Sequence, residues 1–281
     1  MITFSKLGEH GRLGNQLFQY AAIRALSLES GYDLVLPDPE TKSWHGQDCL
    51  LRNFNIPESF FGVASGITYQ AVERDPLHYD AGFWQIPDNT DLVGFWQSLS
   101  YFGKHGGTIK KELTPNKEHL SPAAEYVALM KEKYKKPIVS IHIRRGDMLD
   151  EENKEHYGSL YEASGEYFTY LRKALALFPD CLYLVFTGGK RSEASNDEDI
   201  DWCKSNLGVD AEYSEGSTMQ DFCRMMLCDH SILSPSTSFG WWTAYLSYSK
   251  GKKIIAPANY HPDLKDFNHR QNFYPKEFVL L

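Results

Sequence analysis

Residues 137–150, PIVSIHIRRGDMLD, decide the fold class of this chain. The run 137–143 is largely apolar, with Ser140 and His142 as its polar residues, and it predicts a buried strand. Arg144 and Arg145 follow this strand directly. Two arginines at the end of a buried strand are either solvated loop charges or groups held there to bind an anion.

Similar strands alternate with helical patterns through the second half of the chain. Apolar runs at 181–186, 231–234 and 252–257 predict three further strands. Helical patterns occupy the segments between and beside them, at 167–178, 197–206, 217–229 and 239–248. This alternation is typical of a parallel sheet with helices on both faces.

The N-terminal segment predicts a β-α-β unit. A strand at 2–7 leads into a glycine-rich turn, GEHGRLGN, and then into a helix over 15–30. Gly31 is a stop signal for that helix, and 32–37 reads as the second strand. Glycines between a strand and a helix let backbone N–H groups approach a ligand, and a helix N-terminus favours a phosphate.

Chain length and composition predict two domains. A chain of 281 residues exceeds one ordinary core, and the polar stretch 104–122 looks like a change of domain. We therefore expect an α/β fold of two facing Rossmann-like domains, an N-terminal one over 1–134 and a C-terminal one over 135–281.

Charge and cysteine content exclude several classes of protein. The net charge of -8, with no basic stripe, argues against a nucleic-acid partner, although an anion could still bind where a few arginines gather. The odd number of cysteines, with no C-x-x-C spacing, favours free thiols. The start lacks a signal-peptide pattern, and no apolar run is long enough to span a bilayer. We expect a soluble, cytoplasmic protein, with peripheral membrane contact left open.

Three turns at predicted strand ends could each hold an anion. They are the glycine-rich turn, the arginine turn after 137–143, and the hydroxyl-rich start of the helix at 239–248. Each also has a plainer interpretation: a structural turn, a solvated loop and a helix N-cap, respectively. In the arginine turn we expect one arginine to face the ligand and the other to meet a carboxylate such as Asp147. A nucleotide diphosphate is the simplest ligand common to all three turns.

Other signals in the sequence are weaker. An acidic run, made of Asp197, Glu198, Asp199 and Asp201, could indicate a metal-dependent sugar transferase. It is better interpreted as a helix N-terminus with a solvated face, so no metal site is predicted. Trp241 and Trp242 are expected in the core. A nicotinamide-dependent oxidoreductase is a further alternative, but the glycine spacing does not match G-x-G-x-x-G.

Four blocks of the chain together resemble the α-1,2-fucosyltransferases, the inverting, GDP-fucose-dependent family 11 of glycosyltransferases. The blocks are GRLGNQLFQYA, HIRRGD, SPSTSFGWWTAYL and KKIIAPANY, and their order and spacing match from about residue 7 to residue 260. Related α-1,6- and protein O-fucosyltransferases share looser versions of these patterns and remain an alternative. The resemblance implies a fold of the GT-B type.

The resemblance also implies which residues bind the sugar donor. They are Gly14, Asn15, His142, Arg144, Arg145, Asp221, Ser236, Thr237, Ser238 and Phe239. Gly14 and Asn15 would lie near the diphosphate and the transferred sugar, while the arginines and the three hydroxyl residues would serve the phosphates. His142 and Phe239 would border the nucleoside, and Asp221 would bind the guanine edge. Among these, Arg145 and Asn15 are the catalytic candidates.

The implied reaction moves fucose from GDP-fucose to the 2-hydroxyl of a terminal galactose, without a cofactor or metal. Arginines at the departing diphosphate would stabilise the developing charge. The acceptor glycan would bind the N-terminal half, where aromatic residues gather in irregular segments: Trp44, Tyr69, Tyr79, Trp84, Trp96 and Tyr101. No residue is identifiable as the base. One departure stands out, because FTGG at 186–189 replaces a Ser-Asp-Asp sequence found in many members.

A last alternative is a glycan-binding module that has the fold without the activity. The presence of Asn15, Arg144 and Arg145 argues against it.

Overall fold

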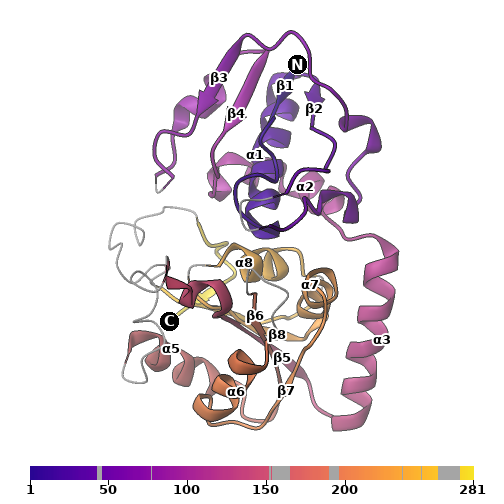
Figure 1. Ribbon diagram of the computed structural model, residues 1–281. Helices are drawn as coiled ribbons and strands as arrows, with labels where there is room; N and C mark the ends of the chain where they lie inside the picture. The colour runs from indigo at the N-terminus through magenta and orange to yellow at the C-terminus, as the bar shows by residue number, and fades with distance from the viewer. Residues whose placement is uncertain are drawn as a thin grey trace. The chain divides into compact units, whose positions relative to one another are not determined.

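The chain divides into two compact units, each described by itself (Figure 1). Unit 1 comprises Met1–Asn116 and His269–Pro275, and unit 2 comprises Lys117–Asn268 and Lys276–Leu281. The structure is a computed structural model that describes residues 1–42, 46–76, 78–151, 153, 165–189, 196–235, 237–247, 249–258 and 273–281.

Unit 1 is built on a parallel sheet in the order β2-β1-β4-β3. Its strands are β1 (Ile2–Thr3), β2 (Leu34–Val35), β3 (Tyr69–Val72) and β4 (Thr90–Val93), and its α-helices are α1 (Leu13–Ser30) and α2 (Gly106–Glu112). Short 3₁₀-helices cover Leu51–Asn53, Glu58–Phe60, Ala81–Gln85, Leu99–Tyr101 and Gly103–His105. The succession β1-α1-β2, with β1 and β2 parallel, confirms the predicted β-α-β unit, and α1 ends at Gly31 as expected.

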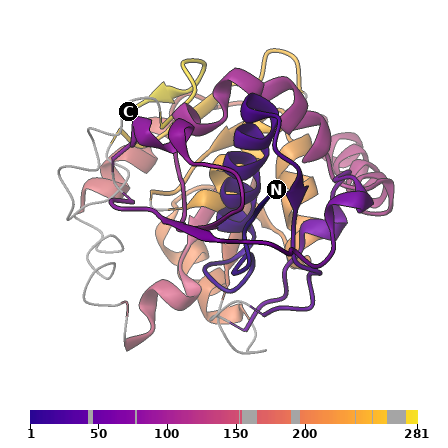
Figure 2. The same cartoon turned by 90° about the horizontal axis from the view of Figure 1, so that it is seen from above.

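Helix α1, the indigo helix of Figure 2, is joined to α2 by a buried side-chain network inside unit 1. The Tyr20 hydroxyl donates to the Glu112 carboxylate at 2.7 Å, and Arg24 Nη2 pairs with the same carboxylate at 2.9 Å. The Arg24 guanidinium also lies over the ring of Phe60, 4.7 Å from its centroid. Because both partners of the carboxylate come from α1, the network fixes the helix whose first turn carries Gly14 and Asn15.

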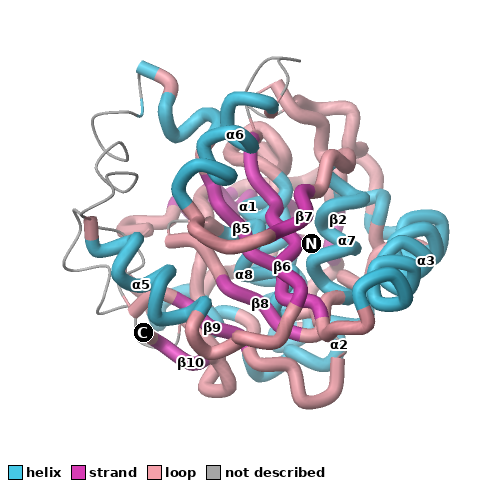
Figure 3. Tube along the Cα trace, turned by 90° about the horizontal axis from the view of Figure 1, so that it is seen from below, coloured by secondary structure: helices cyan, strands magenta, loops and turns pink. Residues whose placement is uncertain are grey.

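Unit 2 contains a larger parallel sheet in the order β10-β9-β8-β5-β6-β7 (Figure 3). The strands are β5 (Ile138–Arg144), β6 (Leu182–Gly188), β7 (Ala211–Tyr213), β8 (His230–Ile232), β9 (Ile254–Ala256) and β10 (Val279–Leu280). The helices are α3 (Lys117–Tyr134), the 3₁₀-turn η6 (Gly146–Leu149), α5 (Glu166–Leu175), α6 (Asp197–Asn206), α7 (Thr218–Leu227) and α8 (Ser238–Tyr245). The predicted strands and helices are all present, whereas β7 and β10, which are short, were not predicted.

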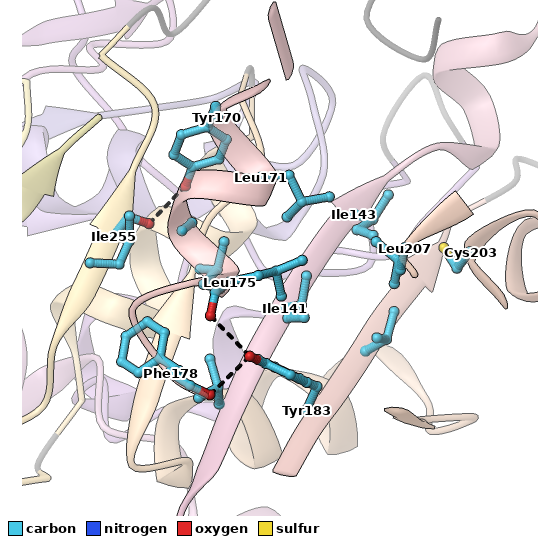
Figure 4. Packing of buried hydrophobic residues seen from close by; sticks show 14 of the residues in the cluster. Ile141, Ile143, Tyr170, Leu171, Leu175, Phe178, Tyr183, Cys203, Leu207 and Ile255 are labelled. Carbon is cyan, nitrogen blue, oxygen red and sulfur yellow. Dashed lines mark hydrogen bonds between the residues drawn. The ribbon is translucent and has the colours of Figure 1, made fainter. Parts of the chain in front are cut away.

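The central strand β5 is buried on both faces, as its apolar sequence predicts. On one face, Val139, Ile141 and Ile143 pack with residues of α5 (Figure 4). On the other face, Ile138 packs with Val127 of α3 and with residues of α7. Helices therefore cover both sides of the parallel sheet, and the ends of its strands are left as the place for a ligand.

Two tyrosine hydroxyls tie α5 to the sheet of unit 2, one near the carboxyl ends of β8 and β9 and the other near the amino end of β6. The Tyr170 hydroxyl lies 2.8 Å from the Leu233 carbonyl and 3.0 Å from the Ile255 carbonyl, just after β8 and within β9. The Tyr183 hydroxyl lies within hydrogen-bonding distance of the Leu175 and Phe178 carbonyls at the end of α5 (Figure 4). These bonds satisfy buried carbonyls and fix α5 on the sheet.

Helix α3 belongs with unit 2, although the boundary predicted at residue 134 assigns it to the N-terminal domain. Its Val127 is part of the core beneath β5, and Lys131 pairs with Asp229 at 2.7 Å. The division along the chain thus falls at residue 116, inside the polar stretch 104–122. Helix α3 begins inside that stretch, and because it is only weakly amphipathic and buries few residues, its sequence gives little sign that it packs in unit 2.

Two further expectations are met within the described residues. All five cysteines are free. Trp241 and Trp242 are 1% and 0% exposed, so they lie in the core as predicted. No helix in the described ranges is both long and apolar enough to cross a bilayer.

Candidate functional site

The candidate site of unit 2 lies where its parallel strands end. After β5 comes the arginine turn, after β6 comes Gly189, after β7 comes Ser214, and after β8 comes Ser234. The carboxyl ends of parallel strands in one sheet meet at one edge, which is the usual ligand position in such folds. The predicted residues Arg144, Arg145, Thr237, Ser238 and Asp221 follow, or lie in the helices that follow, these strand ends.

Arg144 meets the carboxylate that the sequence suggested. It ends β5, and its Nη2 pairs with Asp147 Oδ1, three residues away in η6. The side chain of Asp147 is 6% exposed and that of Arg144 is 17% exposed. The turn η6 therefore folds back on the arginine and fixes its direction.

Arg145 is also paired, with a partner that the sequence did not indicate. Its Nε donates to Asp199 Oδ1 at 3.0 Å, and the backbone N–H of Gly146 donates to Asp199 Oδ2 at 3.2 Å. The guanidinium lies over the ring of Trp202, 4.0 Å from the centroid. One carboxylate thus holds both the side chain of Arg145 and the backbone of the turn.

The interpretation of the acidic run as a solvated face is wrong for Asp199. Asp199 is 3% exposed, whereas Asp197, Glu198 and Asp201 are exposed. Asp199, Ile200 and Cys203 form the buried stripe of α6. That spacing of one, three and four residues was a helical signal that could have placed the carboxylate on the inner face. Among the residues that the structure describes, no group of three metal-binding side chains is found.

The FTGG stretch at 186–189 ends against the arginine turn. Gly146 has φ +41°, and a Cβ there would overlap the carbonyl of Gly188. The N–H of Asp147 also donates to the Gly189 carbonyl at 3.4 Å. The arginine turn therefore lies directly on the backbone at the end of β6. The carboxylate paired with Arg145 comes from Asp199 of α6.

His142 is an uncharged residue inside the site. It is 7% exposed, and burial together with the nearby Arg144 lowers its pKa to about 3. Its ring lies 5.5 Å from that of Phe239 and borders Gly240 at the start of α8. A histidine that resists protonation this strongly is a poor base, so it can border a nucleoside but is unsuited to accept the acceptor proton.

The ring of Phe239 contacts both His142 of β5 and Phe222 of α7. Its ring lies 5.4 Å from that of Phe222, the residue after Asp221 in α7. His142, Phe239 and Phe222 thus form a continuous aromatic row from β5 to α7. His142 and Phe239, which are expected to border the nucleoside, are thus linked through Phe222 to the part of α7 that carries Asp221.

Asp221 is held from two sides. The Ser214 hydroxyl donates to Asp221 Oδ1 at 2.6 Å, and Arg224 Nη1 lies 3.4 Å from the same oxygen. Burial is the main cause that raises the pKa of Asp221, while Ser214 and Arg224 act in the opposite direction. The Arg224 guanidinium lies over Tyr126 of α3, 4.1 Å from the ring centroid. Ser214, which follows β7, and Arg224 therefore orient one oxygen of the Asp221 carboxylate.

The start of α8 has hydroxyl residues that do not cap it in the ordinary way. Thr237 is the N-cap, and its side chain makes no capping hydrogen bond. Thr237 is 6% exposed, and Ser238 is the first helical residue. Capping alone was the plainer interpretation of this stretch, and for Thr237 the structure does not support it. Ser236 lies outside the described residues.

Gly14 and Asn15 lie in the first turn of α1, in unit 1. The N-cap of that helix, Arg12, makes no side-chain capping bond, and the first turn has no acidic residue. Asn15 Oδ1 accepts a hydrogen bond from Gln97 Nε2 at 2.8 Å. Gln97 follows β4 and was not singled out by the sequence, because nothing local links two residues 82 positions apart.

Comparison with known proteins gives a family for nearly the whole chain. The model of glycosyl transferase family 11 matches residues 4–281. Galactoside alpha-(1,2)-fucosyltransferase 2 of Pongo pygmaeus is 27% identical over 277 residues, which cover 95% of this chain and 76% of that protein. The enzyme of the same name from Mus musculus is 26% identical over 284 residues, covering 95% and 75%.

Two solved structures are also similar. POFUT1 in complex with GDP aligns over 99% of this chain and 97% of its own, with 12% identity and a TM-score of 0.48. NodZ alpha-1,6-fucosyltransferase co-crystallized with GDP aligns over 88% and 92%, with 14% identity and a TM-score of 0.48.

Proposed function

Because the chain belongs to glycosyl transferase family 11, we propose that it transfers L-fucose from GDP-fucose to the 2-hydroxyl of a terminal galactose on a glycan acceptor. The relatives named for this activity support the linkage. The observation that carries the proposal in the structure is the arginine turn, where two guanidiniums are fixed by two buried carboxylates at a strand end.

The diphosphate is proposed to bind at the arginine turn and the start of α8. Each arginine is already matched by one carboxylate, so the turn attracts an anion through oriented N–H groups more than through net charge. The hydroxyl of Ser238 and the backbone N–H groups of the first turn of α8 would add further donors. We propose that the fold is of the GT-B type, and that Gly14 and Asn15 in the first turn of α1 also bind the donor.

The nucleoside is proposed to lie along the aromatic row of His142, Phe239 and Phe222. Asp221 would accept hydrogen bonds from the adjacent N–H groups of guanine, since a carboxylate is an acceptor-only group with two oxygens. Ser214 and Arg224 fix one of those oxygens. Uracil lacks the adjacent pair of donors, so this site is expected to prefer GDP to UDP.

The chemical step follows from these contacts. The acceptor O2 attacks the anomeric carbon in line, its bond to that carbon forms, and the bond from the carbon to the phosphate oxygen breaks. The leaving GDP takes the electron pair, and oriented donors from Arg144 and Arg145 stabilise that charge. The hydroxyl proton leaves to a base that is not His142, whose pKa of about 3 makes it too weak. We propose that this step requires no metal ion.

The acceptor is proposed to bind the aromatic cluster of unit 1. Trp96 and Tyr101 are 4% and 1% exposed, so they support the cluster from inside. Tyr79 is 40% exposed, and its hydroxyl accepts a hydrogen bond from Trp84 Nε1 at 2.9 Å. These two rings offer faces for a sugar. Tyr69, also exposed, is a further candidate, and Trp44 lies outside the described residues.

The test is to incubate the protein with GDP-fucose and lactose and to locate any new glycosidic bond by NMR. The expected product carries fucose on the 2-hydroxyl of galactose. Fucose on another hydroxyl would overturn the linkage and favour an α-1,6-type enzyme. Transfer only to a peptide would favour a protein O-fucosyltransferase, and no transfer to any acceptor in a glycan and peptide panel would overturn the function.

A further inference from the structure

We infer that Gln97 is a positioning residue for Asn15, an inference that rests on the function proposed above. Gln97 Nε2 donates to Asn15 Oδ1 at 2.8 Å. A primary amide has a donor end and an acceptor end, so this bond decides which end of Asn15 points where. The amide oxygen is directed to Gln97, and the NH₂ group is directed the other way.

The opposite side of the Asn15 amide is bounded by Gly11. Gly11 has φ +84°, and a Cβ at that position would overlap Asn15 Nδ2, Cγ and Cβ. The amide therefore lies against bare backbone, a contact that needs glycine at position 11. Gln97 on one side and Gly11 on the other hold the side chain in one orientation.

Gln97 is itself held by a rigid segment after β4. The Glu73 carboxylate accepts hydrogen bonds from the backbone N–H groups of Phe95 at 2.6 Å and Trp96 at 3.0 Å. Trp96 has φ +54°, an unfavourable conformation for a bulky residue, and its ring packs on Phe83 and Tyr101. Such a conformation persists where the surroundings determine it, and it clusters at functional sites.

A second amide fastens this segment to the same face of α1. Gln19 Nε2 donates to the Gly94 carbonyl at 2.9 Å. Asn15 and Gln19 are four residues apart, so they lie on one face of the helix. The segment 94–97 thus contacts α1 at two points one turn apart, and the register between them sets where Gln97 meets Asn15.

The hydrogen bond from Gln97 and the close contact with Gly11 orient an uncharged group, the Asn15 amide, in the first turn of α1. A substrate atom that meets Asn15 finds an amide whose direction is set before binding, which is how a preorganised donor lowers a barrier. Reversing that amide would present its oxygen where its NH₂ stood. Gln97 therefore acts on the reaction through Asn15.

The test uses Gln97→Glu, which removes the donor but keeps the shape, together with Gln97→Ala, Asn15→Ala and the double variant Asn15→Ala/Gln97→Ala. Gln97→Glu should lower the turnover number roughly a hundredfold, as when a preorganised donor is lost. The KM for the acceptor should change by no more than about twofold. Gln70→Glu adds the same charge at an exposed position on β3 and should leave turnover unchanged. In the Asn15→Ala background, Gln97→Ala should have no further effect on turnover.

A second measurement does not depend on transfer. In ¹⁵N-labelled protein, Asn15→Ala identifies the side-chain NH₂ signals of Asn15, and these should shift in Gln97→Glu but not in Gln70→Glu. If the wild type transfers no fucose, the proposed function fails while this spectrum still decides the positioning. Unmoved Asn15 signals with turnover within about twofold of wild type would overturn the inference, as would equal losses from Gln97→Ala with and without Asn15.

Discussion

The arginine turn of unit 2 and the glycine-rich turn of unit 1 fix their polar side chains in different ways. In the arginine turn, charges are matched by charges, with Arg144 on Asp147 and Arg145 on Asp199. In the glycine-rich turn, a neutral amide is held by a neutral amide, Asn15 by Gln97. Removing one partner of a buried ion pair is strongly destabilising, because the other charge is left uncompensated. The hydrogen bond between the two amides contributes little free energy, but it sets the orientation of the Asn15 amide.

The largest expected effect comes from breaking the buried pair on its acidic side. Asp199→Asn leaves the charge of Arg145 uncompensated, and this should lower the free energy of unfolding by about 3–5 kcal/mol. Urea denaturation at pH 7.5 measures it. Asp201→Asn, on the same helix with a side chain 74% exposed, is the matched control and should cost under about 1 kcal/mol. In the neutral turn, Gln97→Ala should cost about 1 kcal/mol.

Equal losses from Asp199→Asn and Asp201→Asn would show that the pair with Arg145 contributes no more than a surface contact. The contrast between the two turns would then have no energetic basis.

The next effect concerns turnover. Arg145→Lys keeps a positive charge beside Asp199 but loses the planar fork, so transfer should fall roughly a hundredfold or more. Arg145→Ala is a poorer test, because it leaves the Asp199 carboxylate buried and unpaired and should destabilise the fold. Arg172→Lys, at an exposed position on α5, is the control and should be neutral. Initial rates with saturating GDP-fucose decide the matter; a rate near wild type for a folded Arg145→Lys would contradict the role.

The stability of unit 2 should also depend on pH through His142, which lies in β5 two residues before Arg144. Its pKa is lowered from 6.5 to about 3 by burial, so the unfolded state binds the proton first as pH falls. Stability is then lost between about pH 6.5 and pH 3, and about 2 kcal/mol of it should be gone by pH 5. Unfolding free energies of the wild type and of His142→Gln at pH 7.5 and pH 5 measure the difference. Parallel losses in the two proteins would contradict the assignment.

The smallest expected effect is the response to chelation. Because the leaving diphosphate is served by arginines and helix N-termini in this account, transfer should be unchanged in excess EDTA. Activity that disappears with EDTA and returns with manganese would show that a metal ion takes part.

The same two turns show what the sequence could and could not predict. Local patterns located both: the apolar run 138–143 ends at the arginines, and helical spacing begins beside Asn15. They also located Asp147 as a partner, because it lies three residues from Arg144. The partners Asp199 and Gln97 come from 54 and 82 positions away, and only the folded sheet brings them in.

Two predictions, the solvated acidic face of α6 and the domain boundary at residue 134, differ from the structure, and both concern polar helices with few buried residues. Asp199 was grouped with an acidic run, although α6 turns it inward and its neighbours outward. The predicted domain boundary at residue 134 differs from the division at residue 116, which falls inside the polar segment 104–122 and leaves α3 in unit 2. In both cases the helix buries only a few residues, so its polar composition hides the helical spacing of the buried positions.

The central claim is that the strand ends of unit 2 hold a guanine nucleotide diphosphate. Isothermal titration calorimetry in EDTA, with GDP, GDP-fucose, UDP and NAD in turn, tests it most directly, with Asp221→Asn as the partner variant. The account predicts binding of GDP and GDP-fucose, weak or no binding of UDP and NAD, and loss of the preference for GDP over UDP in Asp221→Asn. Binding of NAD with none of GDP would contradict it.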